Sequence, residues 1–143
     1  MKSIPVVRPL AIAGVLVALF LAGCAAGGGT KPAESLADRA VARWNYLINK
    51  EPEKAWEYMT PGSRQVAPRD QYVRETLVKP VQWTGAEYES QECQSADACE
   101  VLVNVKFRVR SHLTGVGMLD AERRLVETWI RVDGQWYFLP KEQ

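Results

Sequence analysis

The three cysteines are the side chains whose chemistry is best defined in this 143-residue chain. Cys24 ends an apolar run that begins at Leu10 and follows a short basic head. A basic head, an apolar middle and small residues before a cleavage point are typical of a secretory signal. We therefore expect residues 1–23 to be a signal peptide that is removed on export.

The tetrapeptide Leu21-Ala22-Gly23-Cys24 resembles the lipobox of bacterial lipoproteins residue for residue. The resemblance implies cleavage after Gly23, lipidation of the Cys24 thiol and acylation of the new amino group. A transmembrane anchor is the alternative, but the segment from Pro9 spans 15 residues, and about 20 apolar residues are needed to cross a bilayer. In the family, an Asp after the lipidated Cys retains the protein at the inner membrane. Ala25 at this position favours an outer-membrane anchor that faces the periplasm over an inner-membrane one.

The other two cysteines, Cys93 and Cys99, form an even pair in an exported chain, where disulfides persist. Five residues separate them, and both flanks have strand patterns, so a bond between them would staple the mouth of a hairpin. A metal site or a redox dithiol is the alternative, but the spacing is not Cys-x-x-Cys and the chain has one histidine, His112. We predict a disulfide, no metal site and no cofactor.

Few groups in the sequence are suited to acid–base catalysis. The aspartates fall on the polar side of a predicted helix, at a helix start, in turns or in a loop: Asp38, Asp70, Asp97, Asp120 and Asp133. None lies on the apolar face of a predicted strand, and His112 is expected to be an ordinary surface or capping residue. No serine-nucleophile, zinc-protease or phosphate-loop motif occurs, so we name no catalytic residue.

Aromatic residues are the more promising candidates for binding: Trp44, Trp56, Tyr88 and Trp129. In a small domain such residues usually form the core, and the alternative is that they line a pocket for an apolar ligand. We expect Trp44 and Trp56 to face the concave side of a sheet. Trp129 shares a predicted strand face with Glu127 and Arg131, and we expect it to pack across strands rather than to anchor a partner.

Basic side chains follow one side of the predicted strands: Lys106, Arg108, Arg110 and Arg124, with Arg123 and Arg131 nearby. This basic face could meet anionic lipid or an acidic partner. The favoured interpretation is a solvated face paired with Glu87, Glu89 and Glu127. The precursor has 18 Lys and Arg against 17 Asp and Glu, and loss of Lys2 and Arg8 leaves 16 against 17, a formal charge of −1. This balance offers no net field for nucleic acid.

The elements that position these residues change character at Pro80. Before it, apolar residues recur at helical spacing in three segments, 33–49, 53–59 and 69–78. After it, the period is two, which predicts strands over 81–92, 99–110, 125–132 and 135–139, with 111–121 as a loop or a frayed extension of the flanking strands. The order predicts an α+β fold with three N-terminal helices packed on a curved four-stranded antiparallel sheet.

In the first predicted hairpin, a pairing of Cys93 with Cys99 conflicts with the apolar pattern of the two strands. If Cys93 faces Cys99, then Glu87 and Glu89 lie opposite apolar valines on the buried face. A β-bulge between Glu89 and Cys93 would remove the conflict. The alternative is that Glu87 or Glu89 points into a cavity.

The order of elements and the closing pattern Trp129-x-x-x-Asp133-Gly134-x-Trp136 resemble the NTF2-like (cystatin-like, SnoaL-like) superfamily over about residues 33–140. The resemblance implies a sheet wrapped on its helices into a cone, often with a pocket at its open end. It implies no single function. The expected organisation is a signal peptide over 1–23, a flexible tether over 24–32 and an NTF2-like domain over 33–143.

The expected function is that of a non-catalytic binding or assembly module in the cell envelope. The expected partners are the membrane, through Cys24, and an envelope protein, lipid or cell-wall component. The alternative is a small-molecule isomerase or dehydratase that uses the NTF2-like pocket. The sequence does not specify the ligand or the oligomeric state.

Overall fold

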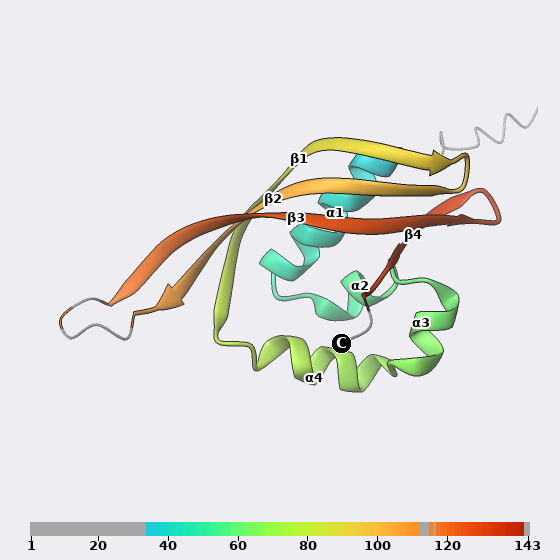
Figure 1. Cartoon of the computed structure of the whole chain (residues 1–143). Coiled ribbons are helices and arrows are strands. Elements are labelled where there is room, and N and C mark those ends of the chain that lie inside the picture. Colours follow the sequence, from blue (N-terminus) through green and yellow to red (C-terminus); the bar gives the residue numbers. More distant parts are fainter. Residues whose placement is uncertain (1–33, 112–114, 116, 142–143) are drawn as a thin grey trace, which may run out of the picture. The chain divides into compact units, whose positions relative to one another are not determined.

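The computed structural model describes residues 34–111, 115 and 117–141, which belong to one compact unit, Lys31–Gln143. The predicted signal peptide, the predicted lipidation site Cys24, the predicted tether and His112 lie outside the described residues. Four helices precede four strands (Figure 1): α1 Leu36–Ile48, α2 Pro52–Trp56, α3 Pro61–Val66, α4 Arg69–Leu77, β1 Val81–Ser95, β2 Ala98–Arg110, β3 Met118–Val132 and β4 Gln135–Leu139. No helix among these residues is long and apolar enough to cross a membrane.

The short helix α3 corrects the prediction of three helices. We expected Thr60-Pro61-Gly62 to end the second helix, but it begins a new one. The Thr60 side chain accepts a hydrogen bond from the Ser63 backbone N–H, and Pro61 occupies the first turn. Proline is tolerated there because that position needs no backbone donor. The same residues therefore act as a start signal.

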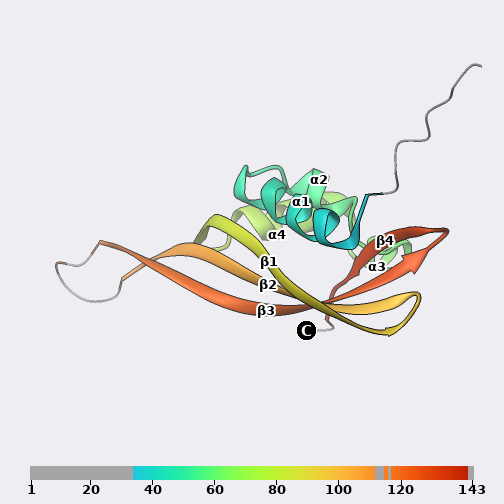
Figure 2. The ribbon, with the colours of Figure 1, turned by 90° about the horizontal axis from the view of Figure 1, so that it is seen from above.

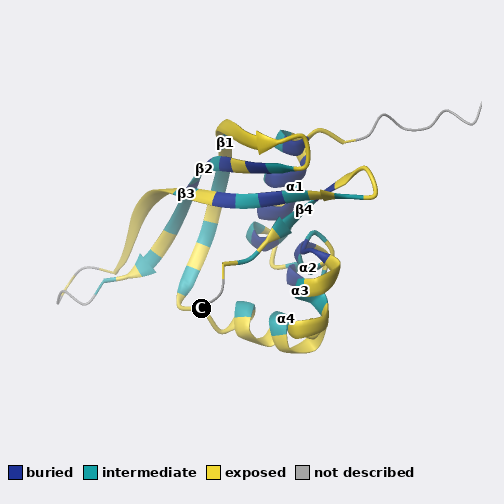
Figure 3. Ribbon diagram, turned by 45° about the vertical axis from the view of Figure 1, so that its right-hand side comes forward, coloured by how far each residue is buried: buried dark blue, intermediate teal, exposed yellow. Residues whose placement is uncertain are grey.

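The four strands form one antiparallel sheet in the order β1-β2-β3-β4. Figure 2 shows the helices on one face of this sheet and, in the part of the chain that the structure describes, no element over the other face. The core lies between α1 and the covered face, and buried positions alternate along β2 (Figure 3): Val101, Val103 and Val105. The expected α+β fold with a four-stranded antiparallel sheet is therefore confirmed.

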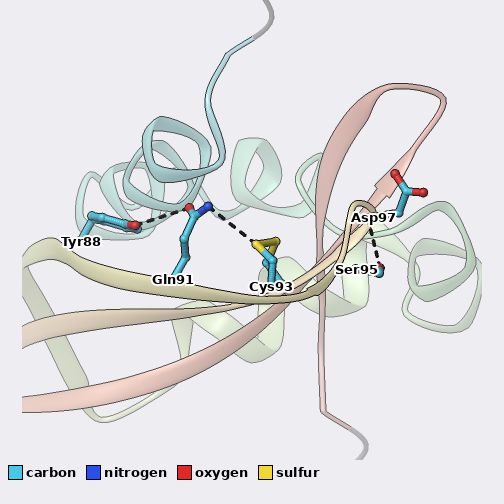
Figure 4. Close-up of a disulfide and its surroundings, with 6 residues drawn as sticks. Tyr88, Gln91, Cys93, Ser95 and Asp97 are labelled. Carbon is cyan, nitrogen blue, oxygen red and sulfur yellow. Dashed lines mark hydrogen bonds between the residues drawn. A yellow bond between two sulfur atoms is a disulfide. The ribbon is translucent and has the colours of Figure 1, made fainter.

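The first hairpin contains a β-bulge, as its sequence predicts. Cys93 pairs with Cys99, whereas Tyr88 pairs with Val103, so the register shifts between Tyr88 and Ser90. The extra residue is Glu89, at the edge of the predicted interval, and this bulge places Tyr88 on the covered side. The Cys93–Cys99 disulfide is present at the mouth of the hairpin (Figure 4).

The alternative, a glutamate in a cavity at this hairpin, is wrong. Glu87 is exposed and accepts a hydrogen bond from Lys106. Glu89 is exposed and accepts one from Arg124. Both carboxylates therefore belong to the solvated surface.

Strand β4 forms backbone hydrogen bonds along both of its edges. One edge pairs with β3 over Thr128–Val132. On the other edge, Met59 bridges to Phe138 in parallel, the Thr60 N–H donates to the Phe138 carbonyl at 3.0 Å, and the Phe138 N–H donates to the Tyr58 carbonyl at 2.8 Å. These bonds fix the junction of α2 and α3 against β4.

Candidate functional site

The most buried charged group of the described residues is Glu127 on β3, which is 5% exposed. Its Oε1 accepts hydrogen bonds from Arg43 Nη1 at 2.8 Å and from Trp44 Nε1 at 2.9 Å. Its Oε2 accepts one from Trp129 Nε1 at 3.1 Å. Three charge-assisted bonds thus replace the water that the carboxylate loses on burial.

Arg43 completes this cluster from α1, where it is 6% exposed. Its guanidinium carbon lies 3.7 Å from the ring centre of Phe138 on β4. A guanidinium is planar and weakly hydrated, so it can stack on a ring while it binds a carboxylate. We call Arg43, Trp44, Glu127 and Trp129 the ionic cluster.

One prediction fails at the ionic cluster, because Glu127 was expected on the solvated basic face. Arg39 and Arg43 are polar residues of α1, which hydrophobic periodicity would assign to solvent. Glu127 instead faces α1, and both arginines are buried, at 7% and 6% exposure. The apolar pattern does not predict the burial of these arginines, because long arginine side chains can bury their stems and stack on aromatic rings.

The ionic cluster is buried. Neither Arg43 nor Glu127 lines the cavities of about 350, 420, 440 and 780 Å³ on the described part of the domain. Both carboxylate oxygens already accept donors from the protein. These bonds join Arg43 and Trp44 of α1 to Glu127 of β3 and so hold α1 on the sheet.

The cavity of about 440 Å³ has a different character. It lies between α1, the α2–α3 segment and β4, and its lining combines aromatic, cationic and polar residues: Arg39, Trp56, Glu57, Tyr58, Arg64, Gln135 and Tyr137. We call it the arginine–aromatic groove. The backbone bonds between Tyr58, Thr60 and Phe138 hold its two sides together.

Rings and guanidinium groups alternate along this groove. The Arg39 guanidinium carbon lies 4.4 Å from the ring centre of Tyr58 and 5.6 Å from that of Tyr137. The Arg64 carbon lies 5.3 Å from the ring centre of Trp56 and 6.0 Å from that of Tyr137. Each arginine is thus attracted by two rings, and Tyr137 is shared by both.

The two arginines of the groove differ in what their N–H groups bind. Arg39 donates to the Trp136 carbonyl at 2.6 Å and to Glu34 at 3.2 Å. With the Gln135 amide oxygen turned toward it, Arg39 also donates to that oxygen at 3.0 and 3.1 Å. The Arg64 guanidinium forms no hydrogen bond or ion pair with any described residue, although Arg64 is half-buried. Its donors are therefore available to a ligand.

Burial raises the pKa of Tyr58 above the ordinary value of its phenol, and the nearby Glu34 carboxylate acts in the same direction. The phenol consequently stays neutral at physiological pH. The groove thus contains the neutral Tyr58 phenol beside two guanidinium groups.

Of the predicted aromatic candidates, the structure brings Trp44 and Trp129 together at Glu127. Trp44 is buried and meets Trp83 at 5.1 Å, and Trp129 is fully buried. Tyr88 is half-buried against the core. Trp56, expected to face the concave sheet, instead packs beside α3, where its Nε1 donates to the Ala67 carbonyl at 2.8 Å. Trp56 faces the other way because α2 is only five residues long and its apolar side is taken by Ala55.

The predicted basic residues lie on exposed strand positions and are mostly paired. Their ion pairs are Lys106–Glu87 at 2.6 Å, Arg108–Asp120 at 2.6 Å and Arg124–Glu89 at 3.0 Å. Arg110 is exposed as well. Exposed pairs of this kind are worth little to stability, and their mutual neutralisation leaves a mixed rather than a basic surface.

The sequence does not predict the groove, because its lining residues do not recur at a helical or strand period. Arg39, Arg64 and Gln135 come from three separate elements and are read individually as surface residues. The described residues include no group of three or more His, Cys, Asp and Glu side chains that could hold a metal ion. The groove is thus the candidate binding site.

Neither a protein-family model nor a curated protein matches this sequence. Solved structures do. A SEC-C motif containing protein from Rhodopseudomonas palustris is 14% identical, with 76% of this chain and 78% of that chain covered and a TM-score of 0.59. A SEC-C motif containing protein from Psychrobacter arcticus is 16% identical, with 76% and 60% covered and a TM-score of 0.55.

A ketosteroid isomerase-like protein from Erwinia carotovora atroseptica is 17% identical, with 70% of this chain and 85% of that chain covered and a TM-score of 0.52. Likeness at such low identity concerns the fold and not the activity. The described domain therefore has an α+β fold similar to that of these proteins, the ketosteroid isomerase-like protein among them.

Proposed function

We propose that this chain is an envelope lipoprotein, anchored at the outer membrane through lipidated Cys24 and facing the periplasm. Its NTF2-like domain is a non-catalytic binding or assembly module. The lipobox at Leu21–Cys24 supports the anchor, because lipid chains bind a membrane through roughly 0.8 kcal/mol per buried methylene and more than one chain gives stable attachment.

The observation that carries the binding role is the burial of the ionic cluster. Enzymes that isomerise substrates by proton transfer need a carboxylate or a comparable group in contact with the substrate. Glu127 is the one buried carboxylate among the described residues, and its two oxygens accept bonds from Arg43, Trp44 and Trp129. The open donors lie instead in the arginine–aromatic groove, which favours binding over catalysis.

The anchor is tested by fractionation of Cys24→Ser. Wild-type protein and a control, Ala26→Ser, are expected in the outer-membrane fraction as processed, lipidated forms. Cys24→Ser should remain unprocessed or reach another fraction. The anchor is refuted if Cys24→Ser fractionates like the wild type.

The binding role is tested by photocrosslinking in the intact envelope. A photoreactive amino acid is placed at Glu57 in the groove and, as a control, at Glu92 on the exposed part of β1. A discrete adduct from position 57 and none from position 92 is expected. Identical patterns from both positions, or no adduct from position 57, would contradict a binding role for the groove.

A further inference from the structure

We propose that Arg64 is the receptor for a carboxylate group, so that the ligand of the arginine–aromatic groove is an acidic carbohydrate. This inference rests on the proposed binding function and specifies its ligand class. It starts from one contrast within the groove: the Arg39 guanidinium donates to three protein partners, whereas the Arg64 guanidinium donates to no described residue.

The rings around Arg64 restrict the position of its guanidinium before an anion binds. Trp56 and Tyr137 lie near its guanidinium, at 5.3 and 6.0 Å, and restrict its position. Rings attract the faces of a guanidinium, which leaves its in-plane N–H donors free. Those donors form a rigid fork that matches the two oxygens of a carboxylate. A side chain that is already positioned loses less entropy when the ligand binds.

The charges around the groove favour a single negative charge on the ligand. The Arg39 charge is offset by Glu34, which it contacts at 3.2 Å. Glu57 also lines the groove and forms no ion pair with Arg64. The Arg64 guanidinium therefore has one positive charge that no described carboxylate pairs with, and this charge matches one carboxylate of the ligand.

The rest of the groove is suited to the part of the ligand that carries the carboxylate. Its volume of about 440 Å³ is at the lower end of small-molecule sites. The half-buried rings of Trp56 and Tyr137 offer apolar surface, and the neutral Tyr58 phenol and the Gln135 amide offer hydrogen bonds. Sugar rings present apolar faces and hydroxyl edges, so a uronic acid unit satisfies both kinds of surface.

The test measures binding of defined probes to the mature lipoprotein in detergent by calorimetry. The probes are oligogalacturonate, which carries carboxylates, neutral dextran and inorganic phosphate. Oligogalacturonate should bind the wild type. Arg64→Gln should weaken it at least about tenfold, the usual effect of losing a charge-assisted hydrogen bond. Arg64→Lys should weaken it too, because lysine keeps the charge and lacks the fork. The matched control, Arg69→Gln on exposed α4, should bind like the wild type.

The proposal fails if oligogalacturonate does not bind, or if Arg64→Gln binds as tightly as Arg69→Gln. It also fails if dextran or phosphate binds as tightly as oligogalacturonate. Melting temperatures of Arg64→Gln and Arg64→Lys near that of Arg69→Gln show that lost binding is not lost folding. If oligogalacturonate does not bind but the photoreactive residue at position 57 still gives its specific adduct, the ligand class is wrong and the binding function stands. If both are negative, both proposals are refuted.

Discussion

Removal of the Glu127 carboxylate should severely destabilise this domain. In Glu127→Ala the Arg43 charge remains buried without a counter-ion, which typically costs about 3–5 kcal/mol. The indole N–H groups of Trp44 and Trp129 also lose their acceptor, at about 1 kcal/mol each or more. A domain of this size has a total unfolding free energy of about 5–15 kcal/mol. We expect a loss of about 5 kcal/mol, which would leave the variant close to unfolding.

A double-mutant cycle separates the ion pair from general packing effects. Arg43→Leu leaves Glu127 with two indole donors and should cost about 3 kcal/mol. The variant Glu127→Leu/Arg43→Leu removes both charges and should be more stable than the sum of the single losses predicts, by about 2 kcal/mol or more. Unfolding is followed by circular dichroism in urea, with the exposed Arg108–Asp120 pair as the control. Arg108→Gln should leave the unfolding midpoint unchanged, since that pair is solvated.

Two outcomes would refute this reasoning. One is a midpoint for Glu127→Ala close to that of Arg108→Gln, which would mean that the cluster is hydrated in solution. The other is full additivity of Arg43→Leu and Glu127→Leu. Additivity would mean that the hydrogen bond of 2.8 Å contributes no coupling between α1 and β3.

Two further predictions concern the covered face of the sheet. The Cys93–Cys99 bond closes a loop of seven residues, so Cys93→Ser/Cys99→Ser should lose about 2.4 kcal/mol by the loop-entropy relation. Mass spectrometry of non-reduced peptides should find the linked pair, and two free thiols in exported protein would contradict it. Trp129 is fully buried, so Trp129→Ala should cost about 3–5 kcal/mol, whereas Trp129→Phe should cost less because it keeps most of the ring. An unchanged melting temperature for Trp129→Ala would show that its core packing is dispensable.

Local patterns were sufficient for most of the secondary structure. The alternation of Val101, Val103 and Val105 predicted a half-buried strand, and these three residues are fully buried. The mismatch between the Cys93–Cys99 pairing and the buried valines predicted an irregular register, which is found at Glu89. Such features follow from the sequence because they depend on residues that are close in the chain, or on a strand period that any register must respect.

Whether the charged residues are buried or exposed depended on the tertiary structure. Arg43 and Glu127 are 84 positions apart, and each is polar, so hydrophobic periodicity assigns both to solvent. Burial becomes favourable when a counter-ion, two indole donors and the Phe138 ring meet at one point. The groove has the same origin, because Arg39, Arg64 and Tyr137 approach only when β4 pairs with the α2–α3 junction. The cost of burying a charge is set by its neighbours in space, and the linear chain does not specify them.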